Sequence, residues 1–353
     1  MKHSESSGTS SMGPSIRRQV TISVVVPIFN EEEVLDALHS AVVNVLEEVG
    51  EPWEIVYVND GSTDASAEKL LALQALNPGV TVVELSRNWG HQPALTAGLQ
   101  VARGEAVVLM DGDFQDPPEV IPDFVEAWRR GAEVVIAQRR TRKETGFRRV
   151  FYPLFYKFMG FLSDYPIPLN AGIFGLLDRR VVNAIVSLSE SNRYLPGMRA
   201  WVGFKTEVVF YDRHERAAGR PKQTFFRLLK YGLDAIFSFS YKPLRLSLVL
   251  GLATATFALL YAVTLVGSRM MGLQLFGPVV WGYTSTIVSV LFVGGIQLIC
   301  LGILGEYIGR IYDEVKQRPL YIVREIHSDA ESMGLIEEHK AKVPTPIKNR
   351  IAA

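Results

Sequence analysis

The sequence predicts an α/β domain built on a mostly parallel sheet, followed by two membrane-spanning helices. Between Ile22 and Ala137, short apolar runs alternate with segments of helical periodicity. This pattern is typical of a parallel sheet covered on both faces. Nearer the carboxyl end are two uncharged apolar stretches, each long enough to cross a bilayer. The chain is therefore expected to have a water-soluble part and a membrane part.

The composition limits the classes of function. The 353 residues leave room for one substantial domain and something smaller. Lys plus Arg and Asp plus Glu both number 37, so the formal net charge is zero and gives no global attraction to nucleic acid. The single cysteine, Cys300, excludes an intrachain disulfide, as expected for a domain facing a reducing compartment. The Ser- and Gly-rich residues 1–20 are expected to be a disordered tail.

Five apolar runs are expected to form the strands of the sheet. They are Ile22–Ile28, Glu54–Val58, Val80–Leu85, Ala106–Met110 and Glu133–Ala137. Ligands bind an α/β sheet at the carboxyl ends of its parallel strands, so the residues that follow each run are the candidates for a site. A dinucleotide-binding fold would carry G-x-G-x-x-G after the first strand, whereas this chain has PIFNEEE.

The segment MDGDFQDPP, Met110–Pro118, is the strongest chemical signal. Asp111, Asp113 and Gln115 bring several oxygen ligands to the end of a buried strand. Mg²⁺ or Mn²⁺ prefers such ligands and keeps open positions for substrate phosphates, so a metal-bridged diphosphate is the first hypothesis. The alternative is an acidic turn whose two prolines open the next helix.

Two other strand ends carry polar residues. Asp60, at the end of the second strand, could accept hydrogen bonds from a ribose or a base N–H, or could form an Asx-turn. Asp64 is expected to cap a helix. Arg87 and Asn88 follow the third strand. We expect His91 to be structural, because it has no partner at metal-ligand spacing and lies where a helix should begin.

The apolar stretches Leu246–Val266 and Phe276–Gly305 are the expected spans. At about 1.5 Å per residue, each covers the roughly 30 Å of a bilayer's hydrocarbon core. The alternative is a pair of helices buried in a large soluble core, but too little chain remains to build one around helices that are apolar on every face. Small residues in both spans could also let copies of the chain pack into a homo-oligomer.

Basic residues flank the spans unequally. They are Arg227, Lys230, Lys242 and Arg245 before the first, Arg310, Lys316 and Arg318 after the second, and Arg269 alone between them. The positive-inside rule then places both termini, and with them the α/β domain, in the cytoplasm. We expect a multi-pass protein of the cell inner (plasma) membrane. Thr224–Tyr241 mixes aromatic and basic residues, which predicts a helix in the interface plane, or else one packed on the soluble core.

These features divide the chain into five parts. We expect a tail at 1–20, the α/β domain at 21–222, interfacial amphipathic helices at 223–243, two transmembrane helices at 244–305 and a cytoplasmic tail at 306–353. Within that last tail, Ile322–Ile326 could add a strand to the sheet or trail along its surface.

Four motifs occur in order between Ile22 and Glu119: VVVPIFNEEE, VNDGSTD, SRNWGHQPAL and MDGDFQDPPE. Together they resemble the family 2 glycosyltransferases, which have the GT-A nucleotide-sugar fold. The two spans after RAAGRPKQTFFRLLKYGLDAIFSFSYKPLR narrow the resemblance to the polyisoprenyl-phosphate glycosyltransferases, relatives of dolichyl-phosphate mannose synthase. The resemblance covers about Thr21–Arg318. It implies transfer of a sugar from a UDP- or GDP-sugar to undecaprenyl or dolichyl phosphate.

The resemblance also assigns roles to residues. The nucleotide sugar would be held by Pro27, Phe29, Glu31, Asp60, Asn88 and Asp111. The metal, Mg²⁺ or Mn²⁺, would be held by Asp111, Asp113 and Gln115. The acceptor phosphate would be contacted by Arg139, Arg149 (or its neighbour Arg148), Arg216 and Lys222. The residues expected to carry catalysis are Asp113, Arg139 and Lys222.

At two places this chain departs from the family pattern, and these departures limit which residue roles can be assigned by resemblance. In the motif R-x-x-G-x-S-K, which begins at Arg216, Pro221 replaces the serine and one hydroxyl donor is lost. In NAGIFGLLDR, relatives often have Asp at the position of Asn170 and Arg at that of Gly175. No role of that carboxylate is carried over.

The expected mechanism needs no general base. A phosphate monoester has a second pKa of about 6, so the acceptor arrives ionised and is its own nucleophile. The protein supplies position, a metal acting as Lewis acid on the leaving diphosphate, and donors for developing charge. A single displacement with inversion is predicted, giving a β-linked product from an α-linked donor.

Three alternatives remain open. A processive polysaccharide synthase would resemble Q-x-x-R-W, but only RAW, Arg199–Trp201, is present, and two spans are few for threading a polymer. A glycolipid-forming transferase would use another lipid acceptor, whereas the basic pairs Arg139–Arg140 and Arg148–Arg149 favour a phosphate. From another class, an inert membrane scaffold would bind the nucleotide sugar without turnover, and the intact metal motif argues against it.

Overall fold

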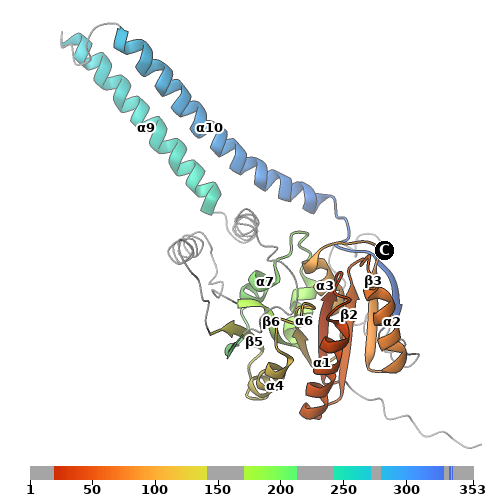
Figure 1. The fold of residues 1–353 in the computed structure, drawn as a ribbon. Helices are drawn as coiled ribbons and strands as arrows, with labels where there is room; N and C mark the ends of the chain where they lie inside the picture. The colour runs from red at the N-terminus through yellow and green to blue at the C-terminus, as the bar shows by residue number, and fades with distance from the viewer. Residues whose placement is uncertain are drawn as a thin grey trace, which may run out of the picture.

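A computed structural model describes residues 20–140, 171–212, 242–271, 280–329, 334 and 336. It consists of an α/β domain and a hairpin of two long helices that projects away from it (Figure 1). In the described residues the domain holds an eight-stranded sheet with the order β7-β5-β6-β4-β1-β2-β3-β8. Strands β6 and β8 run antiparallel to their neighbours, and the other pairs are parallel, so the sheet is mixed but mostly parallel.

The strands alternate with helices as the sequence predicts. The strands are β1 (Ile22–Ile28), β2 (Trp53–Asn59), β3 (Val80–Leu85), β4 (Ala106–Leu109), β5 (Val134–Arg139), β6 (Ala171–Asp178), β7 (Thr206–Tyr211) and β8 (Val323–His327). The helices are α1 (Leu35–Val49), α2 (Ser66–Leu76), α3 (His91–Val101), the 3₁₀ turn η1 (Pro118–Val120), α4 (Ile121–Arg129), α6 (Arg179–Ser187), α7 (Leu195–Trp201), α9 (Lys242–Met270) and α10 (Val280–Val315).

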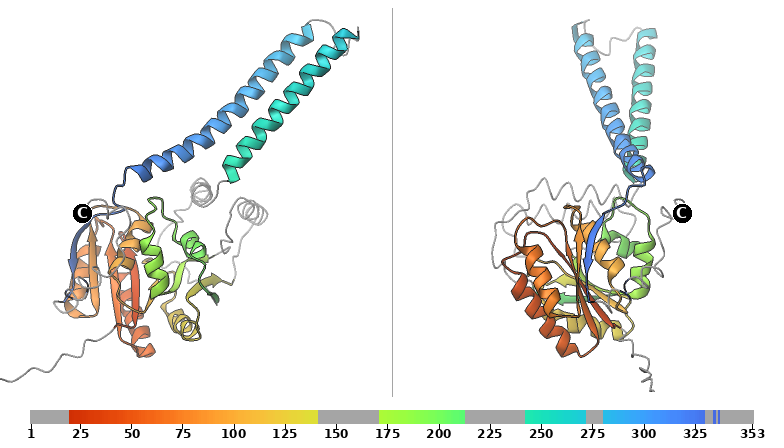
Figure 2. Two further views of the ribbon diagram at one scale, coloured as in Figure 1. Left: turned by 180° about the vertical axis from the view of Figure 1, so that it is seen from behind. Right: turned by 90° about the vertical axis from the view of Figure 1, so that its right-hand side faces the viewer.

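Both faces of the sheet are buried. One face packs against α1, α2 and α4, and the other against α3, α6 and α7 (Figures 1 and 2). The side chains of β1 are buried along the whole strand, which is why its sequence is apolar at every position except Ser23 rather than alternating. All five predicted strands are present, and the Ile322–Ile326 run forms β8, which pairs with the free edge of β3.

Strand β6 lies between β4 and β5 and requires a glycine at position 175. Gly175 has φ 155°, and a Cβ on it would lie 2.2 Å from the carbonyl oxygen of Val135 on the neighbouring β5. An arginine could not occupy this position in this backbone. The glycine is thus a packing requirement of the sheet in this chain.

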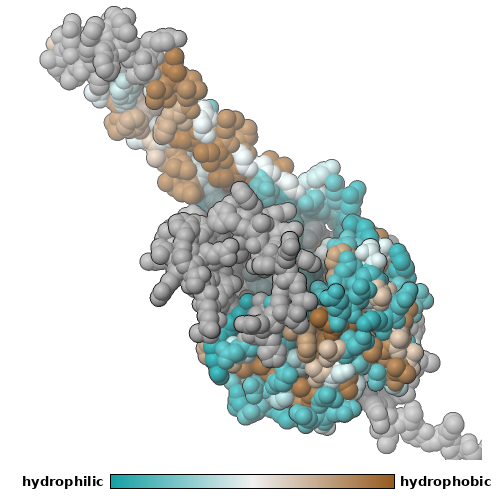
Figure 3. All heavy atoms as spheres, in the orientation of Figure 1, coloured by the Kyte–Doolittle hydropathy of each residue, from teal (hydrophilic) through white to brown (hydrophobic). Residues whose placement is uncertain are grey.

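Helices α9 and α10 lie side by side (Figures 1 and 2), and the described part of the hairpin face seen in Figure 3 is mostly apolar. They contain two candidate membrane spans by length and composition, Lys242–Ser268 and Thr286–Val315, and none of the residues in their most apolar windows is buried. This exposure is not that of core helices of a soluble domain. The first residues of the expected second span, 276–279, lie outside the described part, as does Thr224–Tyr241.

Hydrogen bonds join the base of the hairpin to the α/β domain. The backbone N–H of Ser191, in the loop after α6, donates to the carboxylate of Glu314 near the end of α10, at 3.0 Å. Beyond α10, the carbonyl of Ile322 accepts from the backbone N–H of Ser86 at 2.9 Å. Because Ser86 directly follows β3, the carboxyl edge of the parallel strands faces the base of the hairpin.

Candidate active site

The loops after β1 and β2 are joined by side-chain hydrogen bonds. The side-chain oxygen of Asn30 accepts from the backbone N–H of Thr63 at 2.8 Å, and the Ser66 hydroxyl accepts from the backbone N–H of Glu31 at 3.0 Å. Phe29 is left 43% exposed at this edge. Gly61 brings the loop after β3 into contact, because a Cβ there would lie 2.6 Å from the backbone of Arg87. The three loops therefore form one surface.

Asp60 holds the third loop in place. Its side chain is buried, and its two oxygens accept from the backbone N–H groups of Trp89 at 2.7 Å and Gly90 at 2.9 Å. Burial raises the pKa of Asp60, although both hydrogen bonds act in the opposite direction. The structure thus gives Asp60 a loop-organising role that neither the ligand nor the Asx-turn expectation included. Any bond from a ribose or base would use the remaining lone pairs.

Asp64 acts at the start of α2. Its carboxylate accepts from the backbone N–H groups of Ser66 at 3.0 Å and of Glu32 at 3.3 Å. The N-cap residue of α2 is Ala65, so the prediction that Asp64 caps this helix is wrong by one position, although Asp64 still accepts from a backbone N–H of the first turn. The same carboxylate also joins the first two loops.

His91 and Asp111 meet at the start of the acidic loop. His91 begins α3, as predicted, but its Nε2 also lies 2.9 Å from Oδ1 of Asp111. Desolvation acts to lower the pKa of His91, but the hydrogen bond to Asp111 and the charges of the nearby Asp side chains outweigh it and raise the pKa. This contact is not predictable from local sequence, because the two residues are 20 positions apart and meet only through the order of the strands.

The acidic loop offers oxygen ligands of the kind that Mg²⁺ and Mn²⁺ prefer. Oδ1 of Asp113 accepts from the backbone N–H of Gln115 at 3.2 Å, and Phe114 between them turns the chain with φ 53°. The side chain of Gln115 is buried, and its amide nitrogen has no hydrogen-bond partner. Among the described residues no three His, Cys, Asp or Glu side chains form a closed metal cage. Two carboxylates and an amide nevertheless fit a cation that shares its coordination with a substrate diphosphate.

Arg139, the last residue of β5, belongs to a chain of polar contacts. Its Nε donates to the hydroxyl of Tyr211 at 3.2 Å, and that hydroxyl donates to Oδ1 of Asp116 at 3.1 Å. Burial and the Asp116 carboxylate raise the pKa of Tyr211, so its hydroxyl keeps its proton. Neither Tyr211 nor Asp116 was singled out from the sequence. The signal that could have found Asp116 is its place in the same acidic motif.

The other predicted site residues are distributed as follows. Pro27 lies in β1, and Asn88 is exposed in the loop after β3. In the same loop the guanidinium of Arg87 stacks on Trp89, with Cζ 3.9 Å from the ring centroid. The remaining expected phosphate contacts and the altered family position lie outside the described residues: Arg148, Arg149, Asn170, Arg216 and Lys222.

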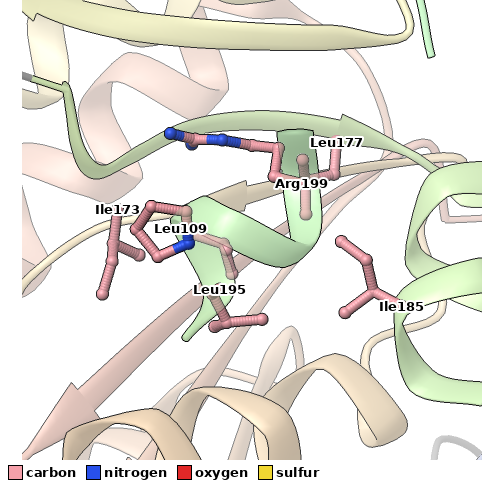
Figure 4. A pocket seen from close by; sticks show the side chains of 7 residues that line it. Leu109, Ile173, Leu177, Ile185, Leu195 and Arg199 are labelled. Atoms are coloured by element: carbon pink, nitrogen blue, oxygen red, sulfur yellow. The ribbon is translucent and has the colours of Figure 1, made fainter. Parts of the chain in front are cut away.

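A small apolar cavity lies beneath this edge of the sheet (Figure 4). It is lined by Leu109, Ile173, Leu177, Ile185, Leu195, Pro196 and Arg199. Arg199 is buried in the domain and donates to the carbonyl of Gly172 at 3.1 Å, and burial lowers its pKa to about 10. The arginine of the RAW segment therefore packs inside the domain.

These elements define a class of protein: a mostly parallel α/β sheet with an acidic loop at its carboxyl edge, joined to an apolar helical hairpin. The chain belongs to glycosyl transferase family 2. The model of that family matches residues 23–186, and the model described as the GtrB C-terminal hairpin matches residues 242–311. The resemblance seen in the four sequence motifs and the predicted fold class are thus confirmed.

The chain aligns with two similar protein sequences along nearly their whole length. An uncharacterized glycosyltransferase of Synechocystis sp. is 42% identical over 87% of this chain and 96% of its own. The SfII prophage-derived bactoprenol glucosyl transferase of Shigella flexneri is 44% identical over 87% of this chain and 98% of its own. Glucosyl-3-phosphoglycerate synthase from Mycobacterium tuberculosis has a TM-score of 0.44 at 19% identity, over 62% of this chain and 76% of that one. That structural likeness is too weak to bear on function.

Proposed function

We propose that this protein is a membrane-bound, inverting glycosyltransferase that transfers a sugar from a UDP- or GDP-sugar to a polyprenyl phosphate. The observation that carries the proposal is Arg139. It ends a strand at the edge where the acidic loop lies, and no described carboxylate pairs with its guanidinium. A half-buried arginine in this position is available for an anionic ligand. The names of the bactoprenol glucosyl transferases among the similar proteins support a prenol-lipid acceptor.

The donor would bind over the three joined loops. Phe29 presents an exposed ring and Glu31 follows two residues later, where the nucleoside is expected. Asp60 holds the neighbouring loop, which carries Asn88. Asp111, Asp113 and Gln115 would hold Mg²⁺ or Mn²⁺, which when bound supplies charge neutralisation for the leaving diphosphate.

The acceptor needs to be positioned rather than activated. Its phosphate is largely ionised at neutral pH and attacks the anomeric carbon without a general base. Arg139 would orient that phosphate, and Arg149, Arg216 and Lys222 are proposed to complete its site. Attack opposite to the leaving diphosphate inverts the anomeric centre, so an α-linked donor gives a β-linked lipid product.

The hairpin would bring the acceptor to this site. The start of α9 and the end of α10 lie toward the α/β domain (Figures 1 and 2). If α9 and α10 span the inner membrane as the excess of basic residues at their base predicts, the domain is cytoplasmic and its carboxyl edge faces the lipid headgroups. The phosphate of a polyprenyl phosphate would lie in this headgroup region, next to the carboxyl edge.

The test is transfer of radiolabelled sugar from a panel of UDP- and GDP-sugars to undecaprenyl phosphate, using full-length protein in detergent with Mg²⁺ or Mn²⁺. We expect one donor to give a chloroform-soluble, mild-acid-labile product. Asp113→Ala should abolish it, and so should removal of divalent cations by EDTA, with recovery when Mn²⁺ is restored. Asp123→Ala, an exposed position in the first turn of α4, is the matched control and should keep full activity.

Other outcomes would contradict the proposal. Transfer to diacylglycerol but not to undecaprenyl phosphate would make the protein a glycolipid-forming enzyme, and a polymeric product would make it a processive synthase. Donor binding without transfer to any lipid would support the inert scaffold. A product that retains the anomeric configuration would exclude the single displacement.

A further inference from the structure

Arg139 and Tyr211 are direct neighbours across two parallel strands. Strands β5 and β7 pair so that Arg139 lies opposite Tyr211, and the next backbone N–H, that of Arg140, donates to the carbonyl of Tyr211 at 3.0 Å. The Nε of Arg139 donates to the tyrosine hydroxyl at 3.2 Å. Backbone and side-chain bonds therefore hold the arginine against the same tyrosine.

The hydroxyl of Tyr211 links this arginine to the acidic loop. It accepts from Arg139 and has a single proton, which it donates to Asp116 at 3.1 Å. The order guanidinium, hydroxyl, carboxylate lets each bond polarise the next. Asp116 is 2% exposed and lies three positions after Asp113, so the chain of bonds runs from the expected acceptor site to the expected metal loop.

The ring of Tyr211 is fixed by the core. It is 4% exposed and meets Phe174 edge-on, with ring centroids 5.5 Å apart. Phe174 in turn meets Phe124 of α4 at 4.9 Å. Because this packing restricts the rotation of the ring, the position of the hydroxyl group is restricted as well.

We propose that Tyr211 is a positioning residue for the acceptor phosphate. It holds Arg139 through Nε, which leaves the two terminal nitrogens of the guanidinium to fork onto phosphate oxygens. Through Asp116 it also fixes the arginine relative to the loop that holds the donor diphosphate. This inference rests on the proposed function, because it assumes that Arg139 binds the acceptor.

The test uses Tyr211→Phe, which keeps the ring and removes only the hydroxyl. Binding of farnesyl phosphate to the full-length protein in detergent is measured by titration calorimetry, together with the KM for undecaprenyl phosphate. We expect both to weaken by about ten- to a hundredfold, the range for losing one hydrogen bond to a charged group. The KM for the nucleotide sugar and kcat at saturating acceptor should stay within about twofold, which also reports that the domain is folded.

Tyr57→Phe is the matched control. Tyr57 is also a buried tyrosine on a strand, and its hydroxyl contacts His39 at 3.1 Å rather than the site. Its removal should leave farnesyl phosphate binding unchanged. Equal weakening in the two variants would mean that any buried hydroxyl matters, and would overturn the inference.

A double-mutant cycle separates positioning from a purely structural role. Arg139→Ala alone should weaken farnesyl phosphate binding, and adding Tyr211→Phe should weaken it no further, since the hydroxyl acts through the arginine. An additive second loss would overturn the inference. If Arg139→Ala weakens binding while Tyr211→Phe does not, only the inference fails. If Arg139→Ala changes nothing, the acceptor role in the proposed function fails with it.

Discussion

At the scale of single residues, Asp60 shows how a buried carboxylate organises a binding surface. A carboxylate has two oxygens, and each accepts one backbone N–H of the loop that leads into α3. An asparagine has only one oxygen and would turn its NH₂ group toward the second N–H. The loop that carries His91 toward Asp111 depends on both bonds.

Asp60→Asn should therefore destabilise the domain by about 1–3 kcal/mol, the cost of leaving a buried donor unpaired, and should weaken nucleotide-sugar binding. Thermal unfolding and calorimetric titration of the donor measure the two effects. Asp36→Asn is the control, because Asp36 is exposed and pairs with Lys69 at the surface, where an ion pair contributes little. Wild-type stability in Asp60→Asn would refute the loop-holding role.

His39 gives a pH dependence that can be derived from its contacts. It is buried, with Nδ1 3.1 Å from the hydroxyl of Tyr57 and Nε2 3.2 Å from the side-chain nitrogen of Asn77. Because an amide NH₂ can only donate, Nε2 accepts and Nδ1 carries the proton. Burial lowers the pKa of His39 below 6.5, and the charge of Asp36 only partly opposes this.

As the pH falls below 6.5, His39 becomes protonated in the unfolded chain, whereas in the folded protein it stays neutral until a lower pH. The contribution of His39 to stability is present above that pH and is lost as the pH falls toward the folded pKa. Melting temperatures between about pH 7.5 and about pH 5 should fall less in His39→Gln than in the wild type. The same pH slope in both proteins would show that His39 does not titrate in this way.

Some of the site could be predicted from single residues and some could not. The positions after β1, β2, β3 and β4 were identifiable because parallel strands end at a common edge. The pairs His91–Asp111 and Arg139–Tyr211 were not, because each depends on which strands are neighbours, and β7 beside β5 leaves no local sign in the sequence.

At the scale of secondary structure, β6 shows why a strand can escape sequence analysis. It contains two glycines, which have low strand propensity and interrupt the large and β-branched residues by which a buried strand is recognised. Strand β7 lies at the edge of the sheet and alternates exposed with partly buried residues, and β8 follows the hairpin, far from its partner β3 in sequence. Burial does not separate β6 from the five predicted strands, because β6 contributes Phe174 to one core and Leu177 to the other.

Gly175→Ala tests the packing of β6. The new Cβ would lie 2.2 Å from the carbonyl oxygen of Val135, which forces the strands apart and should cost about 1–3 kcal/mol or more. Gly172→Ala in the same strand is the control, because its nearest atom would be 4.0 Å away. We expect a large drop in melting temperature only in Gly175→Ala. Equal drops would point to a general intolerance of β6 to alanine.

At the scale of the whole molecule, the hairpin is an insertion between two parts of one domain. The chain leaves the α/β domain before α9 and returns after α10, where Ile322 contacts Ser86 and β8 completes the sheet. Tyr321, next to this contact, donates its hydroxyl proton to the side chain of Gln100 on α3. The apolar helices are therefore held at a fixed place relative to the carboxyl edge.

Cysteine labelling tests the predicted membrane topology. In a Cys300→Ala background, a membrane-impermeant maleimide applied to intact cells should label Gly272→Cys, which lies between α9 and α10 in the sequence, and not Lys316→Cys after α10. Both should be labelled once the membrane is opened. Labelling of Lys316→Cys in intact cells would place the α/β domain outside and contradict the account.

The most direct test of the central claim compares two acceptors that differ by one group. Full-length protein is given the donor it uses, with either undecaprenyl phosphate or undecaprenol at the same concentration in the same detergent. If the phosphate is the nucleophile that Arg139 positions, labelled lipid forms only with undecaprenyl phosphate. Equal transfer to undecaprenol would contradict the account, because an alcohol would then need a general base that this mechanism does not include.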